Sequence, residues 1–219
     1  MKNQYEVAVG DMETLPASDT REEDGLAKVF GRAGAIMLRP SAEWTVVAQE
    51  RGDLSYLLNS YVAILAGIPA LSGLIGFVAI GVGTPNAGTL RVPVFPGLLG
   101  AVFGYLFAFA AVYVLAFIIN VLAPRFGASK NFSEALKLAV YSYTPVWITG
   151  IFLLLPGLWF LTVLGFYSYY LLWRGLPTLM KAPGERALGY AGAVVFAAFV
   201  LRILIGWTEA ALFSLPHVI

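Results

Sequence analysis

The sequence predicts an all-α membrane protein built as a polytopic bundle of five transmembrane helices. Of the 219 residues, 59% are hydrophobic, and the mean hydropathy is +0.78. Only 27 side chains are charged, and 16 of them lie in the first 53 residues. A soluble fold of this length could not hide so much apolar surface from water. The chain has no cysteine and no basic cluster, which sets aside a disulfide scaffold and a nucleic-acid binder.

Long runs without charge indicate where the helices cross the membrane. Residues 54–90 and 92–124 carry no charged side chain, and each run exceeds the ~20 residues that one crossing needs. The run 187–201 is continued past Arg202 by apolar residues as far as Trp207, so it also predicts a span.

The remaining charge-free run, 138–173, is too long for one helix across the membrane. At 1.5 Å per residue it would reach roughly 54 Å, whereas the hydrocarbon core is about 30 Å thick. Pro156 and Gly157 lie at its midpoint and predict a tight hairpin. The five predicted spans are then residues 60–82, 98–122, 134–155, 158–173 and 187–207.

Positive charges predict the orientation of these spans, because Lys and Arg in short loops stay on the cytoplasmic side. Six of them precede the first span, three lie between the second span and the first turn of the third, and three lie between the fourth and fifth. The opposite side receives Arg91 alone. The sequence therefore predicts a cytoplasmic amino terminus and an external carboxyl terminus.

The chain divides into four predicted segments. Residues 1–25 are polar and acidic and predict a disordered cytoplasmic tail. Residues 26–56 predict amphipathic helices that are cytoplasmic or interfacial, 57–207 hold the five-helix domain, and 208–219 form a short external tail. The helix after Pro40 places Trp44 on an apolar face, which predicts either an anchor in the inner leaflet or a helix packed beneath the bundle.

Two prolines fall inside predicted spans and should kink their helices. Pro69 and Pro145 each remove one backbone hydrogen bond, and the freed carbonyls need new partners in lipid. Hydroxyl groups around Pro145 could supply them, on Tyr141, Tyr143 and Thr144.

Residues that could carry chemistry are few. The chain has one histidine, His217, and no cysteine, and no acidic residue lies deep in a span, so no enzyme, metal site or cofactor is predicted. Arg202 is the one charge inside a span. It either snorkels or pairs with Glu209, or it faces a polar cavity with the tyrosines and binds an anionic group such as a lipid headgroup. Asn120 is expected to form a hydrogen bond between helices or to contact a ligand.

Small residues spaced four apart recur along the predicted spans, as at Ser72 and Gly76 and at Gly100 and Gly104. Such spacing lets helix backbones approach closely in lipid. Packing within the bundle is the favoured interpretation, and a seam with a second copy is the alternative.

The order of several short motifs resembles the YIP domain family, the Ypt-interacting membrane proteins, in its bacterial branch. The resemblance covers roughly residues 36–207. It rests on Leu38-Arg39-Pro40 with Trp44, Ile68-Pro69-Ala70, Tyr141 to Pro145, Tyr169 to Gly175, and Met180 to Pro183 with Arg186 to Tyr190. The resemblance implies five membrane helices with a cytoplasmic amino terminus. Eukaryotic relatives bind Rab-type GTPases and shape membranes, but their Asp-Leu-Tyr-Gly-Pro motif is absent here, so Rab binding is not expected.

Taken together, the sequence predicts a non-enzymatic protein of a prokaryotic inner membrane. We expect it to act through membrane partners or by organising the bilayer, with lipids, other membrane proteins or a second copy of itself as partners. The alternative is a small permeation protein with a polar pathway between the kinked helices.

Overall fold

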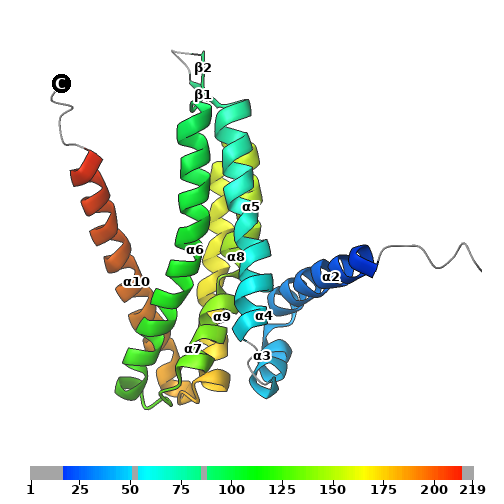
Figure 1. Ribbon diagram of the computed structural model, residues 1–219. Coiled ribbons are helices and arrows are strands. Elements are labelled where there is room, and N and C mark those ends of the chain that lie inside the picture. The colour runs from blue at the N-terminus through cyan, green and yellow to red at the C-terminus, as the bar shows by residue number, and fades with distance from the viewer. Residues whose placement is uncertain (1–16, 51–53, 85–87, 214–219) are drawn as a thin grey trace, which may run out of the picture.

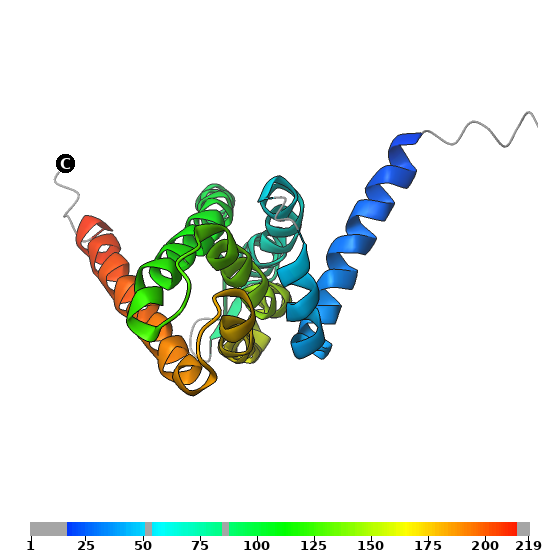
Figure 2. The same cartoon turned by 90° about the horizontal axis from the view of Figure 1, so that it is seen from below.

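The computed structural model describes residues 17–50, 54–84 and 88–213, and these residues are almost entirely helical, as predicted. Figure 1 shows an upright bundle of long helices, with helix α10 (Gly184–Phe213) leaning away on one side and helix α2 (Ala17–Leu38) projecting on the other. Seen from below, both outer helices still point away from the bundle (Figure 2). Helix α2 begins before residue 26, so the helical structure reaches further toward the amino terminus than the sequence predicts.

Among the described residues, three helical stretches are long and apolar enough to cross a membrane: Leu54–Ile80, Val94–Phe126 and Phe132–Leu154. They coincide with the first three predicted spans. Beyond them, the chain returns through the 3-10 helix η5 (Pro156–Phe166) and α9 (Tyr167–Leu179). These pack against the third stretch, and α10 packs against α9 and α6 (Val94–Leu122).

The first stretch is a composite helix. It consists of α4 (Leu54–Tyr56), the π-helical turn η1 (Leu57–Val62), α5 (Ala63–Leu74) and a second π-helical turn, η2 (Ile75–Ile80). Pro69 lies inside α5, as predicted. Its ring fills the space beside Gly150, where an added Cβ would lie 2.5 Å from the Pro69 Cβ. The proline therefore marks a close approach between the first and third stretches.

A short β-hairpin, which the sequence analysis does not predict, joins the first stretch to α6. Strands β1 (Val82–Thr84) and β2 (Gly88–Leu90) pair antiparallel, with Gly83 opposite Thr89. Gly81 and Gly88 both have positive φ, at 83° and 68°, which glycine adopts without steric strain. Helix α6 then runs to the 3-10 turn η3 (Ala123–Phe126).

The third stretch breaks where the sequence predicts a bend. Helix α7 (Phe132–Ser142) ends one residue before Tyr143, and α8 (Thr144–Thr149) begins with Pro145 in its first turn, followed by the 3-10 helix η4 (Gly150–Leu154). The Thr149 hydroxyl donates to the Pro145 carbonyl at 2.7 Å. At Leu155 the backbone becomes extended and the chain turns back at Pro156, which confirms the predicted hairpin.

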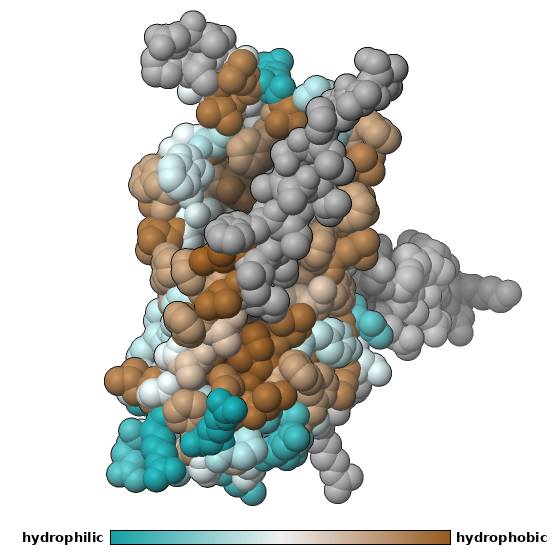
Figure 3. All heavy atoms as spheres, turned by 90° about the vertical axis from the view of Figure 1, so that its left-hand side faces the viewer, coloured by the Kyte–Doolittle hydropathy of each residue, from teal (hydrophilic) through white to brown (hydrophobic). Residues whose placement is uncertain are grey.

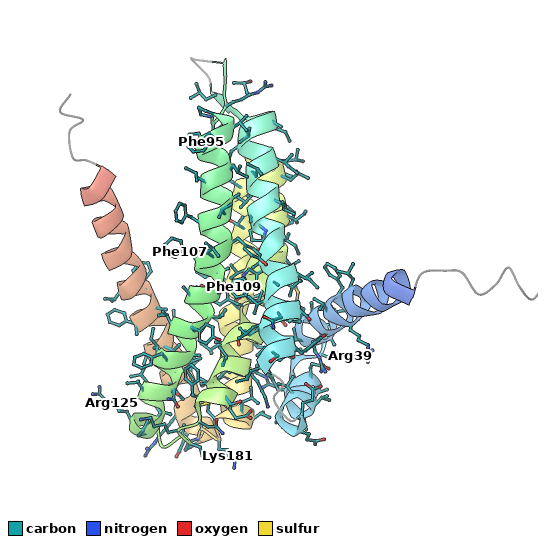
Figure 4. All side chains as sticks on the ribbon, in the orientation of Figure 1. Arg39, Phe95, Phe107, Phe109, Arg125 and Lys181 are labelled. Carbon is teal, nitrogen blue, oxygen red and sulfur yellow. The ribbon has the colours of Figure 1, made fainter. Side chains whose placement is uncertain are left out.

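Helix α3 (Pro40–Gln49) packs against α9 and α2, at the lower end of the bundle in Figure 1. The large apolar side chains of the middle and upper bundle face outward, as the brown surface in Figure 3 shows. Hydrophilic residues gather at the lower end of that face. The labelled Arg39, Arg125 and Lys181 lie toward that same end, whereas Phe95 lies near the hairpin and Phe107 and Phe109 lie between the two ends (Figure 4).

Candidate functional site

Two predicted site residues, Tyr141 and Thr144, belong to a buried aromatic cluster. The Tyr61 hydroxyl shares a hydrogen bond of 2.8 Å with Thr144 Oγ1. The Tyr61 and Tyr141 rings meet edge to face at 4.8 Å, and Trp44 approaches Tyr141 at 6.4 Å. All four side chains are buried. The cluster therefore ties α3 and the first stretch to the break in the third stretch.

Trp44 does not anchor the protein in the inner leaflet, which corrects the first of the two predicted alternatives. Its side chain is fully buried, and an added Cβ on Gly175 of α9 would lie 2.8 Å from the indole ring. Arg174 also donates a hydrogen bond to the Ser41 hydroxyl. The missing side chain at position 175 makes room for the indole, so α3 lies against the bundle instead of presenting Trp44 to lipid.

A group of ion pairs holds the amino-terminal helices to the bundle. Arg32 of α2 pairs with Glu43 and Glu50. Lys137 of α7 pairs with Glu134 at 2.9 Å and donates to the Glu50 carbonyl at 2.9 Å. Burial alone would lower the pKa of Arg32, but the hydrogen bond to Glu43 and the negative charge of Glu50 outweigh it, so the pKa is raised. Arg32 is therefore positively charged at every physiological pH.

These ion pairs border a hollow of about 690 Å³ between α2, α3, the start of the first stretch and α7. We call it the charged pocket; Lys28, Arg32, Glu50, Lys137 and Tyr141 are among its lining residues. The sequence alone does not reveal this pocket, because its charged groups lie up to 109 positions apart. Of the bordering ion pairs, only Glu134 and Lys137 are close enough in sequence to be recognised on one helix.

A second hollow of about 710 Å³ lies deeper in the bundle, and we call it the core cavity. Residues of α5, α6, α7, α8, η5, α9 and α10 line it, and none of its lining residues is charged. Two predicted positions, Pro69 and Tyr143, reach this cavity. Tyr141 and Thr144 do not line it. The charged pocket and the core cavity share no lining residue.

Two serine hydroxyls in the core cavity have no hydrogen-bond partner within the described structure. Ser142, the last residue of α7, is 2% exposed, and Ser168, in the first turn of α9, is 7% exposed. Both line the core cavity. An unpartnered buried hydroxyl is destabilising by about 1–3 kcal/mol, so two of them facing one hollow indicate a place for a hydrogen-bonding ligand.

The two remaining predicted site residues are Asn120 and Arg202, and Asn120 lines neither hollow. Asn120 is in α6, and its Oδ1 is buried without a hydrogen-bond partner in the described part of the chain. Beside it, Tyr190 of α10 donates to the Ile119 carbonyl and stacks on Phe126 at 4.9 Å. Arg202 is a residue of α10, but its side chain lies outside the described structure.

Comparisons with known proteins agree with the predicted resemblance. Residues 34–205 match the Yip1 domain. The inner membrane protein YohC of Escherichia coli K12 is 27% identical over 178 residues, which cover 79% of this chain and 91% of that protein, and YohC of Escherichia coli O6:H1 matches equally. No solved structure matches. The match covers most of the chain and includes α3 and every residue that lines the core cavity. The chain therefore belongs to the Yip1 domain family of membrane proteins.

Proposed function

We propose that this protein organises the inner leaflet of a prokaryotic inner membrane through helix α2, without enzymatic activity. The proposal rests on the position and the surface of α2. The helix projects sideways from the bundle (Figures 1 and 2). It exposes large apolar side chains: Leu26 is 45% exposed, Phe30 is 49% exposed and Leu38 is 83% exposed. The inner-membrane location of the relative YohC supports the proposed compartment.

The orientation follows the positive-charge argument. We propose five spans, with η5–α9 and α10 as the fourth and fifth, and with the lower end of Figure 1 in the cytoplasm. Arg39, Arg125 and Lys181 lie toward that end (Figure 4), and a cytoplasmic excess of Lys and Arg is the usual pattern. A single cysteine introduced at Ser129 should then react only with a membrane-permeant maleimide in spheroplasts, whereas one at Thr89 of the hairpin should react with an impermeant one.

The apolar and charged residues of α2 lie on different faces of the helix, as in a helix that lies at a membrane interface. With 100° between successive residues, Val29 and Ile36 fall on the face that packs against the protein, and both are fully buried. Leu26 and Phe30 fall on the adjoining face and remain exposed, and Lys28 lies on the opposite side. A helix of this kind buries its apolar face in the boundary between headgroups and acyl chains.

The charged pocket gives α2 a fixed position. Arg32 is held by two carboxylates from α3 and its carboxyl-terminal end, and the Tyr167 hydroxyl of α9 donates to the Met37 carbonyl at 2.9 Å. A helix fixed in this way occupies area in one leaflet only. Inserting many copies would expand that leaflet relative to the other, which favours membrane curvature.

The test uses the absence of native cysteine. An environment-sensitive fluorophore on Phe30→Cys should be quenched by lipids brominated on their acyl chains, and the same fluorophore on Lys28→Cys should be quenched much less. Proteoliposomes of the wild type should be smaller or tubulated at high protein density, and the Leu26→Ser/Phe30→Ser variant should lose this effect. Equal quenching at the two positions would rule out the interfacial placement.

Permeation is the second candidate, because the core cavity reaches Pro69 and Tyr143 in the middle of the bundle. This cavity shares no lining residue with the charged pocket, which Tyr141 lines. Fluxes of small neutral and charged solutes into proteoliposomes test it directly, and fluxes equal to those of protein-free liposomes would exclude a permeation pathway.

A further inference from the structure

We propose that the core cavity binds the head of an isoprenoid quinone, a neutral membrane lipid whose ring carbonyls accept hydrogen bonds from Ser142 and Ser168. This inference is independent of the proposed role of α2, because the cavity is lined by other helices.

The position of Ser142 along its helix limits which part of a lipid can satisfy it. Ser142 lies ten residues beyond the start of α7, or about 15 Å along the helix. It lies five residues, or about 7.5 Å, beyond Lys137, which pairs with Glu134. The hydroxyl therefore lies between these charged groups and the bilayer centre, in the inner half of the hydrocarbon core. An acyl chain that reached this depth would carry no hydrogen-bonding group.

The charge of the lining points to a neutral ligand. No charged side chain lines the core cavity, so a phosphate or carboxylate would be buried there without a counter-ion, which is strongly unfavourable. The two unpartnered hydroxyls, by contrast, can each donate one hydrogen bond. A ligand with two uncharged carbonyl oxygens on an apolar frame satisfies both donors.

The aromatic residues of the cavity favour a ligand in which a flat, conjugated ring carries the two carbonyl oxygens. Tyr143 and Trp147 are paired at a ring distance of 5.7 Å, and Phe166 and Tyr169 at 5.4 Å. All four line the cavity. Flat rings pack on such side chains in stacked or edge-to-face geometry, and a volume of about 710 Å³ is in the usual range for small-molecule sites, roughly 300–1,000 Å³.

The apolar remainder of the lining fits an isoprenoid tail. Alanine and aliphatic residues of α6 form one wall, including Ala111, Val114 and Ile118, and Val195 of α10 contributes to the lining as well. Phe107 of α6, which also lines the cavity, is 55% exposed. Part of the wall therefore faces the surrounding lipid, and the tail has a route between cavity and bilayer.

Binding is measured with the full-length protein in lipid nanodiscs, using decylubiquinone as the probe and quenching of tryptophan fluorescence as the signal. Each neutral hydrogen bond contributes about 0.5–1.5 kcal/mol, so Ser142→Ala/Ser168→Ala should weaken binding by roughly 5- to 160-fold. Ser72→Ala is the matched control, because Ser72 is also buried but does not line the cavity. It should bind like the wild type.

A second measurement keeps the inference testable if the double variant folds poorly. Ala111→Phe fills part of the cavity from α6 and should abolish saturable quenching, while its circular dichroism spectrum stays that of the wild type. Mass spectrometry of organic extracts from the purified wild type should find a native quinone in stoichiometric amount. Recovery of diacylglycerol or phospholipid instead, non-saturable quenching in the wild type, or equal affinity in the double serine variant would overturn the inference.

Discussion

The substitution Gly76→Ala tests the close packing between the first and third membrane stretches. Gly76 is in η2, and a Cβ added there would lie 2.0 Å from the Leu153 carbonyl oxygen and 3.1 Å from that of Leu154. Ordinary contact begins at 3.4 Å. Both atoms belong to backbone, so no side-chain rotation can relieve the overlap, and the two helices must move apart by roughly 1.4 Å.

The expected loss of unfolding free energy is about 2–3 kcal/mol, at the upper end of what overpacking usually produces. The matched control is Gly67→Ala in α5, where nothing lies within 4 Å of the added Cβ. Alanine is the better helix former by about 1 kcal/mol, so the control should be neutral or slightly more stable. Equilibrium unfolding in mixed SDS and detergent micelles, followed by circular dichroism, measures both. If Gly76→Ala unfolds at the same SDS fraction as Gly67→Ala, the close approach between η2 and η4 is refuted.

Three further substitutions test the amino-terminal contacts. Trp44→Ala should lower the unfolding free energy by about 3–5 kcal/mol, because it leaves a large cavity against Gly175. The control is Trp159→Ala, which should be nearly neutral in the same SDS titration because the Trp159 side chain is 64% exposed. Arg32→Gln leaves two carboxylates without their partner and should make α2 more sensitive to limited proteolysis than Lys28→Gln does; equal cleavage rates would contradict the ion-pair arrangement. Tyr61→Phe removes only the hydrogen bond to Thr144 and should shift stability by about 1 kcal/mol, and a shift above 3 kcal/mol would indicate that the hydroxyl has a further role.

Features that depend on local composition are the ones that the sequence predicts well. The first three membrane stretches overlap the charge-free runs, although Arg125, Glu134 and Lys137 lie within the ends of the second and third stretches. The turn at Pro156 follows from a proline and a glycine in the middle of a run that is too long. The break after Ser142 follows in the same way from Pro145. In each case the physical cause lies within a few residues of its effect.

Features that depend on pairing between distant segments could not be predicted. Tyr61 and Thr144 are 83 positions apart, and the Tyr167 hydroxyl reaches a carbonyl 130 positions earlier. Periodicity placed Trp44 on an apolar face, but it could not say whether lipid or protein covers that face. Ser168 carried no signal at all, because a lone serine in an apolar run is common in membrane helices.

The contacts of α3 and of the end of α2 also constrain the order in which the molecule assembles. Trp44 rests on Gly175, Ser41 accepts from Arg174, and the carbonyl of Met37 accepts from Tyr167. During translation, the amino-terminal segment emerges long before any of these partners exists, so its docking must wait until α9 has been synthesised. Ribosome-bound chains arrested before residue 167 should therefore leave α3 open to protease, and chains arrested after α10 has emerged should protect it.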